Sequence, residues 1–267
     1  MRNCALITGA TGGLGKAYVE QCAYLGYDLV LTATKQERLD KLKAEIRSKY
    51  NVNVWTKAAD LSNDKSREEL FAFLKSEKIE VNMLLNNAGY IFEGSFLGCD
   101  SAEIMKAINV NIIGNMDLTH RFLSQRNTER KNYVLFVSSL AGFTPMPQMA
   151  TYAATKAYLI SFAVALREEM KDKNVSVTVV CPGGMATSEA MKKSIKAQGL
   201  SGKLSAQSVE KIAKGSLKRL LKNRAIYIAG WFNHFMKFAS SIPPRSFVAK
   251  FVGKRWTKSQ KKQGIYR

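Results

Sequence analysis

Short apolar runs of strand length alternate with amphipathic segments along most of the chain. The apolar runs are CALITG, DLVLTA, VNVWTKAAD, VNMLLNNAG, YVLFVSS, VSVTVVCPGG and AIYIAG. Runs without alternating polar positions are typical of strands that are covered on both faces, as in a parallel sheet wrapped by helices. The pattern therefore predicts an α/β protein with a Rossmann-type, doubly wound parallel sheet of about seven strands.

The amphipathic segments between these runs predict helices. Three early helices are expected over residues 16–25, 36–49 and 64–76. A long helix is expected before YVLFVSS, and another through Tyr152. The Gly- and Ser-containing insertion at 185–204 predicts a loop or a helix pair, and the stretch at 225–242 predicts a strand followed by an amphipathic helix rather than a membrane span.

The length and composition favour one large domain. The chain has 267 residues, 46% of them hydrophobic, which is enough to bury a core. No repeat, low-complexity segment or linker interrupts the pattern. We therefore expect a single domain over residues 1–230, which includes the 185–204 insertion, and a C-terminal extension over residues 231–267.

The chain is strongly basic, and much of the excess charge lies late. Forty-one Lys and Arg against 21 Asp and Glu give a net charge of +20, and no acidic residue follows Glu210. This charge favours anionic partners. The aromatic and basic extension is most typical of a helix packed on the body or across a subunit interface. A membrane-surface helix is the next reading, and a nucleic-acid surface is the least favoured.

The spacing of the cysteines and the first apolar run indicate the cellular compartment of the protein. The cysteines are widely spaced and form no C-x-x-C pair, so neither a disulfide framework nor a metal site is indicated. The first apolar run breaks at glycines within about ten residues, which is too short for a signal peptide or a membrane span. We expect a cytoplasmic protein with reduced thiols. The four cysteines are Cys4, Cys22, Cys99 and Cys181.

A glycine-rich loop, TGATGGLG, follows the first predicted strand. Gly9, Gly13 and Gly15 lie between a strand and a helix, where glycine permits a tight turn and lets the helix N-terminus approach a pyrophosphate. The spacing T-G-x-x-x-G-x-G differs from G-x-G-x-x-G. It resembles the cofactor loop of the short-chain dehydrogenase/reductase family.

Other motifs of that family follow in order over roughly residues 3–230: DLS at 60–62, NNAG at 86–89, NVNIIG, SSLAG, YAATK and PGGMAT. The resemblance implies that Asp60 and Leu61 contact the adenine ring and that Thr187 contacts the nicotinamide carboxamide. It also implies a homodimer or homotetramer. The dinucleotide contacts expected from these motifs are Thr8, Gly9, Thr11, Gly13, Leu14, Gly15, Asp60, Leu61, Asn87, Ala88, Gly89, Tyr152, Lys156, Pro182, Gly183 and Thr187.

Four residues are candidates for catalysis of an alcohol–ketone interconversion. Tyr152 and Lys156 lie four apart on a predicted helix and so share one face, which suits proton transfer. Tyr152 is the expected acid and base, and a neighbouring Lys156 ammonium favours its phenolate. Ser139, thirteen positions before Tyr152, is expected to donate to the carbonyl oxygen. By resemblance, Asn111 holds a water that connects Lys156 to solvent.

The end of the second strand decides between NAD and NADP. An acidic residue there would bind the ribose hydroxyls and repel a 2′-phosphate. The sequence instead places Thr34 and Lys35 at that point, with Arg38 close behind, so NADP(H) is favoured over NAD(H). The chain departs from many NADP-using members of the family, which carry Arg where it has Thr34 and a basic residue where it has Gly12.

Apolar residues dominate the segments expected around the reacting carbonyl, which favours a bulky hydrophobic substrate. A hydroxysteroid or bile-acid-like molecule is the leading candidate, and a 3-oxoacyl thioester is the alternative. A non-catalytic dinucleotide sensor that binds a membrane or nucleic acid through its tail is a third reading. Lys192 and Lys193 of the 185–204 insertion are expected to hold an anionic tail of the substrate. Expected substrate contacts are Phe92, Ser139, Phe143, Met146, Met149, Tyr152, Met185 and Met191.

Overall fold

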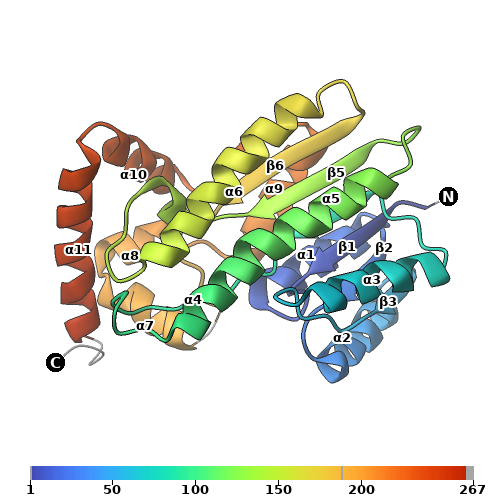
Figure 1. Ribbon diagram of the computed structural model, residues 1–267, viewed down its shortest axis with the longest axis horizontal. Helices are drawn as coiled ribbons and strands as arrows, with labels where there is room; N and C mark the ends of the chain where they lie inside the picture. Colours follow the sequence, from blue (N-terminus) through green and yellow to red (C-terminus); the bar gives the residue numbers. More distant parts are fainter. Residues whose placement is uncertain (1, 188, 263–267) are drawn as a thin grey trace.

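The computed structural model describes residues 2–187 and 189–262 and contains one parallel sheet of seven strands (Figure 1). The strand order is β3-β2-β1-β4-β5-β6-β7. This confirms the predicted Rossmann-type architecture. The strands are β1 (Cys4–Thr8), β2 (Asp28–Thr32), β3 (Val54–Thr56), β4 (Met83–Asn86), β5 (Asn132–Val137), β6 (Val175–Cys181) and β7 (Ile226–Ile228).

The strand order reverses at β1, which pairs with β2 on one side and β4 on the other. The chain first builds the sheet outward to β3 and then returns to continue from β4. In open α/β sheets, ligands bind at the carboxyl ends of the strands at this switch point. The loops after β1 and β4, which carry the glycine loop and NNAG, meet there.

Helices cover both faces of the sheet. One face packs against α1 (Gly13–Tyr24), α2 (Gln36–Lys49) and α9 (Val209–Leu221), and the other against α3 (Asp64–Ser76), α5 (Asn115–Gln125) and α6 (Ala150–Glu169). Successive strand residues enter opposite cores: Leu6 packs in one and Ile7 in the other, and both are fully buried. This burial on both faces explains the unbroken apolar runs.

Four helices gather beyond the carboxyl edge of the sheet, at the left of Figure 1. The 185–204 insertion contains the helix pair α7 (Glu189–Ala197) and α8 (Leu200–Ser205), and the extension forms α10 (Trp231–Ser241) and α11 (Arg245–Lys262). No helix within the described ranges is both long and apolar enough to cross a membrane.

Two predicted boundaries shift for physical reasons. The first helix begins at Gly13 rather than at residue 16, because the glycine turn leads directly into it from Gly12. The strand expected from VNVWTKAAD shrinks to Val54–Thr56, because β3 lies at the sheet edge and pairs only with β2.

Candidate active site

The glycine loop is packed too closely for side chains. Gly9 has a φ of +61°, in the region that favours glycine, and a Cβ on Gly15 would lie 2.1 Å from the Gly9 carbonyl oxygen. No side chain caps the start of α1 at Gly12. The first amide groups of α1 and its positive dipole end are therefore available to a phosphate.

The residues after β4 fix the shape of this loop. Thr8 Oγ1 accepts hydrogen bonds from the backbone amides of Asn87 and Ala88, both at 2.9 Å. The Asn87 side chain donates to the carbonyl oxygens of Thr8 at 2.9 Å and Gly9 at 3.2 Å. Thr8 and Asn87 therefore position the glycine loop, which the motif match alone did not indicate.

The adenosine end of the expected site lies between β2 and β3. Thr34, Lys35 and Arg38 are exposed where β2 ends and α2 begins, and no ion pair among the described residues involves either cation. Asp60 is exposed and accepts hydrogen bonds from the amide and hydroxyl groups of Ser62. Leu61 is buried.

The P-G-G-M-A-T segment after β6 closes over the glycine loop. A Cβ on Gly13 would lie 2.7 Å from Thr187 Cγ2, so Thr187 packs directly on the glycine loop. Pro182 and Gly183 line the adjoining cavity. The segment therefore reaches both the glycine loop and the substrate side of the site.

Lys156 is anchored between α6 and the end of β5. Its Nζ donates to the carbonyl oxygen of Val137 at 2.9 Å, and Ser138 Oγ donates to the Lys156 carbonyl at 2.7 Å. Nζ lies 5.7 Å from the centre of the Tyr152 ring. Burial lowers the pKa of Lys156 to about 8, against an opposing interaction with Cys181.

Tyr152 and Ser139 are brought together by a one-turn 3-10 helix, η2 (Leu140–Phe143), which begins directly after Ser139. A Cβ on Gly142 would lie 2.8 Å from the Lys156 carbonyl oxygen, so glycine lets η2 pack against α6. Burial raises the pKa of the Tyr152 phenol, and a hydrogen bond with Ser139 opposes this shift. Ser139 therefore favours the phenolate, and the role expected of Lys156 stays a prediction.

Asn111 lies in a π-helical segment, η1 (Asn109–Gly114), between α4 (Ser101–Ile108) and α5. Its Oδ1 accepts from the Tyr90 amide and its Nδ2 donates to the Tyr90 carbonyl, both at 2.8 Å. Nδ2 also donates to Thr155 Oγ1 at 3.1 Å. A Cβ on Gly89 would lie 3.4 Å from both Asn111 Oδ1 and Lys156 Nζ, so these two groups approach each other across Gly89.

Thr155 is a buried residue of the site that the sequence motifs did not single out. It is buried, accepts from Asn111, and donates to the Tyr152 carbonyl at 2.8 Å. It therefore joins the π-helical segment to the Tyr152 turn of α6. The signal available in the sequence was its place inside YAATK, one residue before Lys156.

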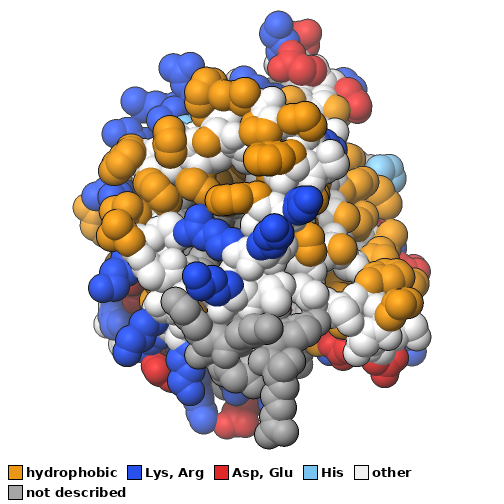
Figure 2. Space-filling model, turned by 90° about the vertical axis from the view of Figure 1, so that its left-hand side faces the viewer, with side chains coloured by type: hydrophobic (Ala, Val, Ile, Leu, Met, Phe, Trp, Pro, Cys, Tyr) orange, Lys and Arg blue, Asp and Glu red, His pale blue; other side chains and the backbone are white. Residues whose placement is uncertain are grey.

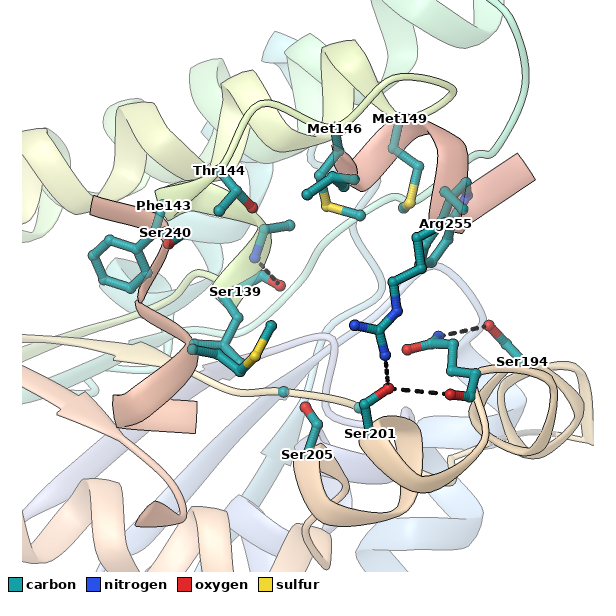
Figure 3. Close-up of a pocket in the computed structure, with 18 of the residues that line it drawn as sticks. Ser139, Phe143, Thr144, Met146, Met149, Ser194, Ser201, Ser205, Ser240 and Arg255 are labelled. Atoms are coloured by element: carbon teal, nitrogen blue, oxygen red, sulfur yellow. Dashed lines mark hydrogen bonds between the residues drawn. The ribbon is translucent and has the colours of Figure 1, made fainter. Parts of the chain in front are cut away.

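A cavity of about 910 Å³ opens at Ser139 and Tyr152 (Figure 3). Five of the expected apolar contacts line it: Phe143, Met146, Met149, Met185 and Met191. Phe92 does not line it, whereas its neighbour Ile91 does. The C-terminal helices close the remaining side, which the sequence did not predict. Their apolar contributions are Phe232, Met236 and Ala239 from α10 and Phe247, Val248, Phe251, Val252 and Trp256 from α11.

The structure does not support the expected role of Lys192 and Lys193 in holding an anionic tail. Neither residue lines the cavity, and Lys192 pairs with Glu189 at 2.7 Å. The α7 helix is amphipathic and turns Met191, Ser194 and Ile195 toward the cavity instead. The cations at the cavity wall come from α10 and α11.

A phosphate-binding glycine loop at the switch point, with a serine, a tyrosine and a lysine beside an apolar cavity, defines a dinucleotide-dependent oxidoreductase of carbonyl and alcohol groups. The short chain dehydrogenase family model matches residues 3–198. The chain belongs to the short-chain dehydrogenase/reductase family.

Two relatives and one solved structure illustrate which proteins the chain is similar to. The very-long-chain 3-oxoacyl-CoA reductase of Mus musculus is 32% identical over 254 residues, which cover 93% of this chain and 78% of that protein. The Rattus norvegicus reductase of the same name is 34% identical, with 68% of this chain and 59% of that protein covered. A solved 7beta-hydroxysteroid dehydrogenase shares the fold, with a TM-score of 0.85, 24% identity, and coverage of 94% of this chain and 96% of that one.

Proposed function

We propose that the protein is an NADPH-dependent reductase that converts a ketone on a bulky, hydrophobic substrate into a secondary alcohol. The observation that carries this proposal is the large apolar cavity that opens at Ser139 and Tyr152. A 3-oxoacyl thioester is the favoured substrate, because the very-long-chain 3-oxoacyl-CoA reductases are more than 30% identical to the chain. A hydroxysteroid or bile-acid-like ketone is the second candidate, supported by the cavity volume, which suits a polycyclic molecule.

The preference for NADP(H) rests on the end of β2. Lys35 and Arg38 are exposed there, and the position that would carry the acidic residue of an NAD enzyme is Thr34. A 2′-phosphate would therefore meet two cations at this point, and Glu37 between them is paired with Lys41 at 2.8 Å. A fold neighbour from Sphingobium yanoikuyae was solved with NADPH, which agrees with this preference.

The residues of the site divide the chemistry of reduction between them. The reduced nicotinamide, when bound, supplies the hydride. Tyr152 donates a proton to the ketone oxygen as the alcohol forms, and Ser139 donates a hydrogen bond to the same oxygen as negative charge develops. Lys156, close to Asn111 across Gly89, keeps two of its three N–H groups for the cofactor ribose and for restoring the proton.

The test is NADPH oxidation by the purified protein against 3-oxoacyl thioesters, keto-steroids and keto-bile acids, with Tyr152→Phe as the control. We expect one class to consume NADPH and the variant to lose turnover by about 10²- to 10⁴-fold while it still binds NADPH. Tight NADPH binding without turnover on any ketone would favour the sensor reading. Near-normal turnover by the variant would remove Tyr152 from the mechanism.

A further inference from the structure

Three cations line the substrate cavity, and all come from the C-terminal helices: Lys237 of α10, and Arg255 and Lys258 of α11. Glu93 is the one acidic residue among the described residues of the lining. None of the ion pairs within residues 2–187 and 189–262 includes any of the three cations. An apolar cavity with excess positive charge suits an amphipathic anion.

Arg255 is the cation that extends into the cavity among polar groups (Figure 3). Its guanidinium donates to Ser201 Oγ. Ser201 Oγ in turn donates to the Gln198 carbonyl at 3.1 Å, and the Gln198 side chain donates to Ser194 Oγ at 3.3 Å. A guanidinium has five N–H donors in a planar fork, so most of the Arg255 donors remain for a ligand.

Arg255 and Ser139 approach the cavity from different elements, α11 and the end of β5 (Figure 3). Lys237 differs from Arg255 because its ammonium lies over the Phe143 ring, 5.1 Å from the ring centre. We propose that Arg255 binds an oxyanion, a carboxylate or a phosphate, on a substrate whose ketone lies at Ser139 and Tyr152. This inference rests on the proposed reductase function and names the chemical class of its substrate.

The kinetic test compares Arg255→Gln with Lys254→Gln, which removes the same charge from the adjacent, exposed residue outside the cavity lining. Each variant is assayed on a 3-oxoacyl-CoA and its uncharged N-acetylcysteamine thioester, and on a keto-bile acid and its methyl ester. We expect Arg255→Gln to raise KM for the anionic member of one pair by roughly 10- to 100-fold, with kcat and the neutral member unchanged. The affected pair identifies the anion as phosphate or carboxylate.

A binding measurement separates failure of this inference from failure of the proposed function. Laurate and adenosine 3′,5′-bisphosphate are titrated calorimetrically into the protein, which requires no turnover. Weaker binding of one probe to Arg255→Gln than to Lys254→Gln supports the anion site even where no ketone is reduced. Equal behaviour of the two variants in calorimetry and kinetics overturns it.

A second, independent observation concerns the outer face of α10. Phe232 and Met236 line the cavity, but another set of large apolar side chains lies outside its lining, at spacings of four, three and four residues. This spacing forms one stripe along a helix. The α10 stripe and its exposed fractions are Trp231 (74%), Phe235 (56%), Phe238 (63%) and Ile242 (69%).

The charge around the α10 stripe has one sign. No acidic residue occurs between residues 211 and 267, and Figure 2 shows hydrophobic and basic side chains across this side of the molecule, with acidic ones near its margins. Two copies packed through this basic face would repel each other. An anionic lipid surface offers negative charge together with an apolar layer for the aromatic rings. We infer that the α10 stripe docks on an anionic membrane surface.

The test is co-sedimentation with neutral phosphatidylcholine vesicles and with vesicles that also contain phosphatidylserine. We expect binding to the anionic vesicles that weakens with salt. The double variant Phe235→Ser, Phe238→Ser should lose at least about 10-fold in binding, whereas Phe96→Ser, Leu97→Ser, which removes exposed apolar residues elsewhere, should not. Absent binding, or equal binding by both variants, overturns the inference. If the α10 variant has a lower native mass than the unaltered protein, the α10 stripe is instead an interface between copies.

Discussion

The ammonium group of Lys156 is hydrogen-bonded at 2.9 Å to the carbonyl oxygen of Val137, the last residue of β5. This bond ties α6 to the carboxyl edge of the sheet, where Ser139 follows two residues later. The same helix carries Tyr152 one turn earlier, on the same face. The packing of α6 on the sheet edge, and not the surrounding loops, therefore fixes the distances among Ser139, Tyr152 and Lys156.

The pH dependence of turnover should report the Tyr152 phenol. Burial raises the pKa of this phenol, so it stays protonated at neutral pH. Reduction uses the protonated phenol and should be nearly flat from about pH 6 to about pH 7, below the pKa of about 8 of Lys156, whereas oxidation uses the phenolate and should rise with pH into the alkaline range. The measurement is kcat/KM in both directions across this range.

The variant Ser139→Ala tests whether the Tyr152 phenol sets the alkaline rise of the oxidation rate. The hydrogen bond from Ser139 lowers the pKa of Tyr152, so its removal should move the alkaline rise of the oxidation rate to higher pH. The variant should also lose turnover by roughly 10- to 1000-fold, because the developing oxyanion loses a donor. An unchanged pH profile would mean that another group titrates.

Cofactor selectivity should depend on the two cations after β2. Lys35→Ala with Arg38→Ala should weaken NADPH binding by roughly 10- to 100-fold, since each removes a charge-assisted contact with the 2′-phosphate, and leave NADH binding unchanged. Lys41→Ala is the control, because Lys41 lies further along α2 and is paired with Glu37 at 2.8 Å. Both affinities can be measured by nucleotide fluorescence. Equal losses for NADPH and NADH would point to a folding defect.

Dinucleotide binding should depend on the free space around the loop glycines more than on the φ angles that they adopt. Gly15→Ala would place a Cβ 2.1 Å from the Gly9 carbonyl oxygen, so it should abolish dinucleotide binding and lower thermal stability. Gly26→Ala is the matched variant: its φ of +78° is unfavourable for alanine, but no atom lies within 4 Å of the added Cβ. It should cost about 1 kcal/mol of stability and leave NADPH binding intact. Melting temperatures and nucleotide titrations distinguish the two.

The sequence predicted the bounds of a helix best where a local pattern marks its ends. The helices expected at 36–49 and 64–76 match α2 and α3, and Asn63 caps α3 by accepting from the Ser66 amide at 3.1 Å. The candidate catalytic groups could be named because their spacing along strands and helices fixes their relative positions. Ser139, Tyr152 and Lys156 meet as that spacing requires.

The parts that were not predicted depend on contacts between distant segments. The π-helical turn at Asn111 forms where the carboxamide binds both backbone groups of Tyr90, which no sequence period reveals. Lys192 and Lys193 lie outside the cavity lining because the amphipathic α7 helix places Met191, Ser194 and Ile195 there instead. Arg255 reaches the cavity through the packing of α11, which follows the last of the family motifs by more than 50 residues and has no motif of its own.

The position of α11 should control access to the cavity without affecting the cofactor. Gly253 lies against the segment before α6, where a Cβ would be 2.9 Å from Pro147 Cγ. Gly253→Leu should therefore push α11 away from Pro147 and enlarge the cavity, at a cost of about 1–3 kcal/mol in stability. We expect a higher KM for long hydrophobic ketones, an unchanged Kd for NADPH, and a smaller effect on short ketones that do not reach α11.

Lys250→Leu is the control for this prediction, because it places the same side chain on α11 at an exposed position outside the cavity lining. It should leave KM for every ketone unchanged. If Gly253→Leu and Lys250→Leu change KM equally, surface hydrophobicity rather than the α11 contact with Pro147 is responsible. If Gly253→Leu weakens NADPH binding as well, the displacement has spread to the Tyr152 side of the site, and α11 supports the catalytic groups in addition to closing the cavity.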